Sequence, residues 1–232
     1  MKYLILFTSI LFFGCNLSEE NNDNIKSKST NNVTAKSEDM VSLDKIEVAK
    51  QFQFKNPDRL TEEDTLILEL NDVNYQITPI GLFSINETDS IKLKTENGVK
   101  KAYIYEDRFN YYIFFEDLDL VYCSSYIEKI SKKTMSSEYS ELIYFNLGQP
   151  IILNEFAFVS AIGFVGKLNL KTGQFIWKHD DLYDNEKYSF NFFDTVIIKH
   201  ETTEFISENY HSKSIDKIII DNKSGEIKEI IK

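Results

Sequence analysis

The chain has only two cysteines, three prolines and eight glycines among its 232 residues. Two cysteines cannot build the dense disulfide framework of small secreted domains, and the low proline and glycine contents exclude collagen-like and proline-rich chains. Basic residues are also few, because 26 Lys and Arg stand against 37 Asp and Glu, for a net charge of −11. Nucleic-acid binding needs a basic surface that releases counterions from phosphates. The composition therefore argues against a nucleic-acid partner.

The N-terminus has the organisation of a signal peptide. Lys2 is followed by an uncharged, mostly apolar run over residues 3–13, and then by Gly14 and Cys15. This run is too short to span about 30 Å of hydrocarbon as a helix, so residues 1–14 are predicted to be a signal peptide. The segment that ends at Cys15 resembles the lipobox of bacterial lipoproteins, in which the cysteine is acylated and becomes the mature N-terminus. The resemblance implies lipid attachment at Cys15; the alternative is an ordinary secretory signal with an incidental cysteine.

Residues 15–38 are predicted to be the lipid anchor and a flexible tether, because this stretch is rich in Asn, Ser, Lys and Thr and has no hydrophobic periodicity. By analogy with bacterial lipoproteins, Asn16 in place of Asp implies transport to the outer membrane. Ser18-Glu19-Glu20 resembles the acidic signal that exports some lipoproteins of Gram-negative bacteria to the cell surface. A linker that happens to be acidic is the alternative.

Residues 39–232 are predicted to form an all-β domain. From Thr65 onward, β-branched and aromatic residues dominate, and short apolar–polar alternations such as residues 165–170 are separated by turn residues. One short helix is predicted within Asp39–Gln51, where apolar residues recur every three positions. The predicted strands are residues 65–70, 75–78, 91–94, 99–105, 110–115, 125–130, 141–146, 156–160, 163–170, 175–179, 188–193, 195–199, 217–220 and 226–230.

A turn motif recurs in the second half of the chain. Lys167–Trp177 resembles the repeat of pyrroloquinoline-quinone-type β-propellers, with Thr172, Gly173 and Trp177 at the matching positions and Asn169 in place of the usual Asp. The glycine can adopt a positive φ, the Asp or Asn can bond to backbone amides of the turn, and the aromatic residue can pack on the next unit.

Two further copies are in phase with this motif. Fifty-two residues later, Asp221, Ser224 and Gly225 repeat the turn, and Glu229 stands at the Trp position. Thirty-eight residues earlier, Thr134 and Tyr139 occupy the Thr and Trp positions, and Met135 replaces the glycine.

The clearest repeats therefore cover residues 120–232, and no copy can be phased over residues 60–119. At roughly 40–45 residues per unit, the resemblance implies a small or partial propeller-like array of antiparallel sheets with about four blades. The alternative is a two-sheet β-sandwich.

The sequence offers few candidates for catalytic residues. The sequence contains no phosphate-binding loop, nucleophile elbow or H-E-x-x-H motif, and it predicts no catalytic residue, no metal site and no cofactor, quinone included. Of the three histidines, His200 and His211 are interpreted as solvated loop residues rather than metal ligands, and His179 falls within the predicted strand 175–179. Two carboxylate runs, Asp180–Glu186 and Glu116–Asp119, are interpreted as exposed acidic loops. Cys123 is interpreted as a buried, inert thiol, and four clustered tyrosines (Tyr103, Tyr105, Tyr111 and Tyr112) as core residues rather than a sugar-binding face.

Three short segments resemble the acceptor site for O-glycans on exported proteins of some Gram-negative bacteria. They are Asp64-Thr65, Asp89-Ser90 and Asp194-Thr195, and whether they are modified stays open.

Two functions remain at this stage. The first is a non-catalytic β-repeat module, anchored to the outer membrane through its lipid, which binds a protein or a glycan as an envelope accessory or immunity-type lipoprotein. The acidic charge favours a basic partner. The alternative is a small envelope hydrolase that uses a carboxylate pair not located in the sequence.

Overall fold

The computed structural model describes residues 47–53, 65–70, 72–95, 98–117, 124–183, 193, 195–208 and 215–232. All of them belong to one compact unit of the chain, residues 35–232. The predicted signal peptide, Cys15, the tether and Cys123 lie outside the described residues. None of the described segments is a helix long and apolar enough to cross a membrane.

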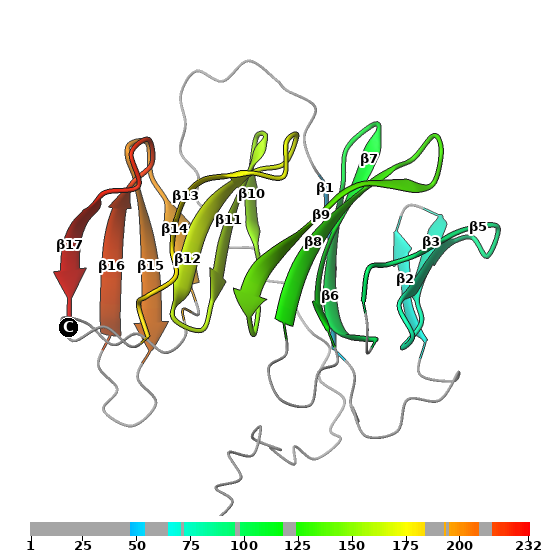
Figure 1. Cartoon of the computed structure of the whole chain (residues 1–232), viewed down its shortest axis with the longest axis horizontal. Helices are drawn as coiled ribbons and strands as arrows, with labels where there is room; N and C mark the ends of the chain where they lie inside the picture. Colours follow the sequence, from blue (N-terminus) through cyan, green and yellow to red (C-terminus); the bar gives the residue numbers. More distant parts are fainter. Residues whose placement is uncertain are drawn as a thin grey trace, which may run out of the picture. The chain divides into compact units, whose positions relative to one another are not determined.

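The described part of the chain is all-β, as predicted, and its strands form four antiparallel sheets (Figure 1). Sheet 1 contains β2 (Leu66–Leu70), β3 (Val73–Ile77), β4 (Leu82–Ile85) and β5 (Asp89–Lys92). Sheet 2 contains β1 (Glu47–Gln53), β6 (Val99–Glu106), β7 (Asn110–Asp117), β8 (Ser124–Ser131) and β9 (Ser136–Phe145). Sheet 3 contains β10 (Ile151–Leu153), β11 (Phe156–Ala161), β12 (Phe164–Asn169) and β13 (Phe175–His179). Sheet 4 contains β14 (Thr195–Ile198), β15 (Thr202–Glu208), β16 (Ile215–Asp221) and β17 (Ile227–Ile231).

Three hydrophobic cores join these sheets in series. The first lies between sheets 1 and 2, the second between sheets 2 and 3, and the third between sheets 3 and 4. Strand β7 is apolar at successive positions because both of its faces are covered by neighbouring sheets. Ile113 and Phe115 enter the first core, whereas Tyr112 and Phe114 enter the second, because successive side chains of a strand point to opposite faces.

The series is open at its ends. Each core of the described residues joins two consecutive sheets, and none joins sheet 4 to sheet 1. Each sheet is an up-and-down run of consecutive strands, with β1 added at the edge of sheet 2. This is a propeller-like, unclosed arrangement, in which neighbouring sheets pack face to face as they do in a sandwich.

The helix predicted within Asp39–Gln51 is wrong for its described part, because residues 47–51 belong to strand β1. This strand pairs with β6, with Glu47 opposite Glu106 and Gln53 opposite Lys101, and a register shift between them. Pairing with a distant strand overrides a weak local preference for helix. Strands β4, β10 and β15 were not predicted, and residues 188–192 of one predicted strand lie outside the described part.

Candidate functional site

The three turns singled out by the sequence share one hydrogen-bonding pattern. Each joins the last two strands of its sheet, and the backbone N–H of one residue donates to the carbonyl four positions earlier. These bonds run from Met135 to Ser131 (2.9 Å), from Gly173 to Asn169 (2.8 Å) and from Gly225 to Asp221 (3.0 Å). Gly173 and Gly225 have φ values of 75° and 76°, and Met135 adopts 46° at the same position. The turn therefore requires a left-handed residue, which glycine provides without Cβ strain.

The side chain at the start of two of these turns fastens the loop. Asn169 Oδ1 accepts hydrogen bonds from the backbone N–H groups of Lys171 (2.8 Å) and Thr172 (3.3 Å). Asp221 Oδ1 accepts from the N–H of Ser224 (2.8 Å) and also from its hydroxyl (3.0 Å). These bonds, the backbone bond from Ser224 first, hold the pKa of Asp221 below its ordinary value.

Trp177 connects sheet 3 to sheet 4. Its side chain is buried, with 7% exposed, and lies edge-on to the rings of Phe158 and Phe205. Its Nε1 donates a hydrogen bond to the carbonyl of Asn222 (3.2 Å), in the turn between β16 and β17. A Cβ added at Gly225 would lie 2.4 Å from Trp177 Cβ, so the indole packs directly on the bare backbone of the next sheet's turn.

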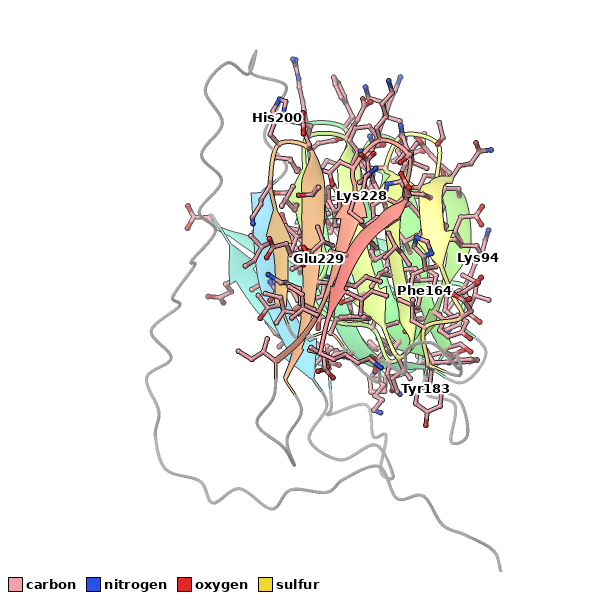
Figure 2. All side chains as sticks on the ribbon, turned by 90° about the vertical axis from the view of Figure 1, so that its left-hand side faces the viewer. Lys94, Phe164, Tyr183, His200, Lys228 and Glu229 are labelled. Atoms are coloured by element: carbon pink, nitrogen blue, oxygen red, sulfur yellow. The ribbon has the colours of Figure 1, made fainter. Side chains whose placement is uncertain are left out.

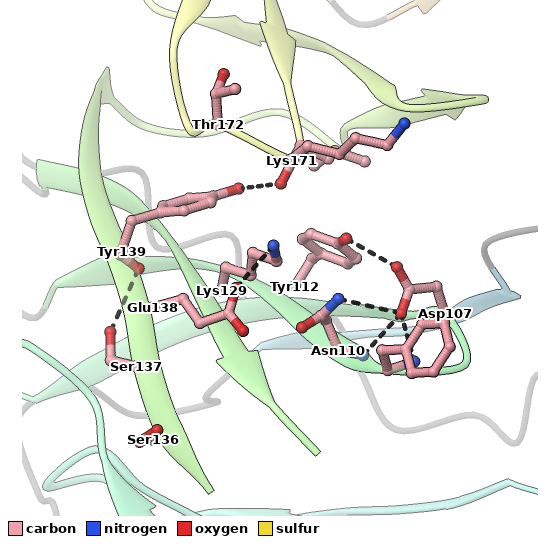
Figure 3. A network of polar contacts seen from close by, with 12 residues as sticks. Asp107, Asn110, Tyr112, Lys129, Ser136, Ser137, Glu138, Tyr139, Lys171 and Thr172 are labelled. Carbon is pink, nitrogen blue, oxygen red and sulfur yellow. Dashed lines mark hydrogen bonds and ion pairs between the residues drawn. The ribbon is translucent and has the colours of Figure 1, made fainter. Parts of the chain in front are cut away.

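Tyr139 connects sheet 2 to sheet 3 in the same manner. Its hydroxyl donates to the carbonyl of Leu170 (2.8 Å), as Figure 3 shows. A Cβ added at Gly173 would lie 2.9 Å from the tyrosine ring. Burial raises the pKa of Tyr139. Two aromatic residues thus each pack on the turn glycine of the following sheet.

The two ends of the series lack this contact. The last hairpin of sheet 1 turns through Asn86 and Glu87, which both have positive φ, and is too short to carry the motif. Ile91 and Met135 instead pack against the first core. Glu229 is exposed on β17, in sheet 4, which lies nearest the viewer in Figure 2. A charged residue is tolerated there because no described sheet covers that position.

The sequence interpretation of Glu116 and Asp117 as exposed is wrong, because both are buried. The Glu116 carboxylate lies 2.7 Å from Lys101 Nζ, and Asp117 Oδ1 accepts a hydrogen bond from the hydroxyl of Thr95 (2.8 Å). Glu128, also fully buried, accepts from the backbone N–H of Lys94 (2.9 Å) through one oxygen. Buried carboxylates require such partners. Here Glu116 links β7 to β6, and Asp117 and Glu128 fasten the β5–β6 connection to sheet 2.

The other polar candidates are dispersed. His179 lies on β13, within the strand predicted over residues 175–179, and its Nε2 is 2.7 Å from the carbonyl of Gly225. His200 is exposed, and Asp180 pairs with Lys178 at 2.9 Å. The described residues contain no group of three His, Cys, Asp or Glu side chains that could hold a metal ion. His211, Asp119, Asp184 and Glu186 lie outside the described part.

The structure places the clustered tyrosines and the possible glycan acceptors, which bear on binding or attachment of carbohydrate. Tyr103, Tyr105, Tyr111 and Tyr112 are all buried, so these rings fill the cores between sheets. Burial raises the pKa of Tyr111 to about 12. Of the possible glycan acceptors, Ser90 and Thr195 are exposed, and Asp64 and Asp194 lie outside the described residues.

The terminal sheets differ in the faces that they turn away from the cores. On sheet 1 this face is polar apart from Ile67, which is 57% exposed, and the half-buried Leu82. Its polar residues are Glu69, Asn74, Gln76, Ser84, Ser90 and Lys92. On sheet 4 the corresponding face, here called the outer face of sheet 4, carries five isoleucines among six charged residues. The isoleucines are Ile197, Ile206, Ile215, Ile219 and Ile231, and the charged residues are Lys199, Glu204, Glu208, Lys217, Asp221 and Glu229.

Glu204 lies at the centre of this outer face and is nearly buried. Its carboxylate pairs with Lys199 and, at 3.2 Å, with Lys217. The hydrogen bond from Lys199, supported by Lys217 and opposed by burial, holds the pKa of Glu204 below its ordinary value.

We expect the ion pairs of Glu204 with Lys199 and Lys217 to make the free energy of unfolding depend on pH. Because the pKa of Glu204 is lower in the folded than in the unfolded chain, its contribution is present above the unfolded value and is lost as the pH falls through the folded value. The Glu204→Gln variant should therefore lose less free energy of unfolding than the wild type as the pH falls below about 4. Denaturant unfolding of both proteins between pH 7 and pH 3 measures this difference, and parallel curves would contradict it.

Comparison with known proteins adds no identity. No protein-family model matches the chain, and no curated protein matches it. Function is therefore argued from the geometry of the described residues.

Proposed function

We propose that this protein is a non-catalytic interaction module, anchored to the outer membrane by lipid on Cys15, that binds a protein partner. The observation that carries the proposal is the outer face of sheet 4. A sheet is stable when both faces are covered or when the uncovered face is polar. Here the uncovered face keeps Ile197 39%, Ile215 62% and Ile231 38% exposed. Exposed apolar groups gathered on one face are typical of protein-binding surfaces.

The chemistry of this face favours protein over glycan as the partner. Its apolar residues are aliphatic, whereas the clustered tyrosines that could have stacked on sugars are buried between the sheets. The face is also rigid, because Phe205, Ile218 and Ile220 fix the other side of the same strands in the third core. A pre-organised sheet loses little conformational entropy on binding.

The lipid anchor is tested by Cys15→Ala. Without the cysteine there is no acceptor for the acyl chains, so the protein should leave the membrane fraction for the soluble fraction of the envelope. Immunoblots of fractionated cells measure this distribution, with Ser18→Ala as a control for changes next to the signal. Retention of Cys15→Ala in the membrane would contradict lipid anchoring.

The binding function is tested by co-purification of the tagged, lipidated chain from gently solubilised envelopes. Before solubilisation the envelopes are treated with an amine-reactive cross-linker, so that a weakly held partner is retained. We expect one cross-linked protein partner, a second copy included, that is lost when Ile197 and Ile231 are both replaced by glutamate. A wild-type preparation with no bound protein would contradict the proposal.

A further inference from the structure

We infer that the outer face of sheet 4 binds the same face of a second copy of this chain, in a two-fold symmetric pair. The inference rests on the proposed function and names its partner. It is supported by the register of the strands, the balance of charge on the face and the contrast with sheet 1.

The register places the side chains of this face in two adjacent rows across four strands. One row runs Ile197, Glu204, Ile219, Glu229, and the next runs Thr195, Ile206, Lys217, Ile231. Isoleucines and charged residues therefore alternate both along and across the strands. Such a face offers apolar contacts at intervals across its full width, which suits packing against another sheet whose side chains interdigitate with it.

The charge of this face favours a second copy over an unrelated charged partner. The chain as a whole carries −11, so two copies repel each other over most of their surfaces. On the outer face of sheet 4, Lys199 and Lys217 balance Glu204 and Glu229. The carboxylate of Asp221, at the end of β16, lies 3.9 Å from Lys228 Nζ. Glu208, opposite Ile215 at the edge of the face, adds one further acidic residue. A two-fold contact brings a patch against itself, which requires a patch that does not strongly repel itself. A basic partner, by contrast, would be selected by a large excess of carboxylates across the face, and here the excess is the single residue Glu208 at its edge.

The contrast with sheet 1 defines the symmetry of the pair. If copies stacked head to tail, the outer face of sheet 4 would meet the outer face of sheet 1, which is polar apart from Ile67 and Leu82. Burying Glu69 or Lys92 under isoleucines would cost desolvation without supplying partners. Repeat arrays end in polar caps of this kind. Sheet 1 is such a cap and sheet 4 is not, so the face of sheet 4 pairs with itself.

The area of the face predicts a weak pair. Four strands about 4.8 Å apart, with about five residues at 3.3 Å each, cover roughly 300–400 Å². Stable complexes bury about 800 Å² per partner. Confinement of anchored copies to one membrane raises their local concentration, so pairing is expected in envelopes. In dilute solution the pair should dissociate.

The test is thiol cross-linking of the full chain in intact envelopes with a short bismaleimide. Ile197→Cys and Ile231→Cys place thiols on the outer face of sheet 4, at positions already exposed to solvent. Ile67→Cys is the control, because it places a thiol at an even more exposed isoleucine, 57% against 39% and 38%, on the other terminal face. We expect a covalent homodimer from the first two variants and only the wild-type background from the third.

A second substitution tests whether the face itself makes the contact. Adding Ile219→Glu to Ile197→Cys should lower the dimer yield about tenfold or more, because it forces an unpaired charge into the interface. Unchanged far-ultraviolet circular dichroism and melting temperature of the purified variant show that it still folds.

Three results would overturn the inference. They are equal cross-linking through Ile67→Cys, no dimer from either sheet 4 variant, and a dimer that Ile219→Glu leaves unchanged. Cross-linking of the face to a different protein would also overturn the second copy as partner, but would leave the proposed interaction module standing.

Discussion

Replacing Trp177 by alanine should lower the free energy of unfolding by about 3–5 kcal/mol. The indole is 7% exposed and fills the space between the rings of Phe158 and Phe205, so its removal leaves a cavity in the third core. The hydrogen bond to the carbonyl of Asn222 is lost as well. Denaturant unfolding of the wild-type and variant chains measures the loss.

The neighbouring residue provides the control for this substitution. Ile176 lies on the same strand but is 48% exposed, so Ile176→Ala should change stability by no more than about 0.5 kcal/mol. Equal melting temperatures for wild type and Trp177→Ala would show that the contact between sheets 3 and 4 contributes nothing to stability.

Gly225→Ala should cost about 2–4 kcal/mol, from two separate causes. The residue has φ of 76°, where a Cβ costs about 1 kcal/mol or more. The new methyl group would also lie 2.4 Å from Trp177 Cβ and 2.6 Å from its Cγ, and overpacking of this kind costs about 1–3 kcal/mol. Thermal and denaturant unfolding measure the sum.

A double-mutant cycle separates these causes. In the Trp177→Ala background the indole atoms are gone and only the Cβ contact and the backbone strain remain, so Gly225→Ala should cost less than it does in the wild type. Strictly additive losses would mean that the glycine is needed only for its φ and for the contact with the Cβ of residue 177, and that the indole ring does not press on this turn.

The fold class could be predicted from the sequence because its signals are local. Alternation along β12 and the β-branched content of β16 specify strands without reference to any partner. The turn glycines were visible for the same reason, since a left-handed residue is required by the turn itself. Strand β1 was missed because its conformation depends on pairing with β6, about 50 residues away.

The candidate site was harder to predict from the sequence, for a similar reason. The burial of Glu116 and Asp117 depends on Lys101 and Thr95, which approach them only in the folded chain. A run of acidic residues in the sequence does not reveal such partners. The outer face of sheet 4 did leave a signal. Glu229 stands where the earlier repeats have a docking aromatic residue, and in the structure it lies exposed on this face.

Strand β1 also has a mechanical consequence. The first described strand begins at Glu47, opposite Glu106, at the edge of sheet 2 and beside the turn that begins at Asp107. If Cys15 holds the protein to a membrane, tension reaches the domain through this edge strand and loads its hydrogen bonds to β6. A strong pull would strip β1 from sheet 2 while sheets 3 and 4 carry no load, because their connections to the anchor run through sheet 2. The outer face of sheet 4 would thus be insulated from such forces.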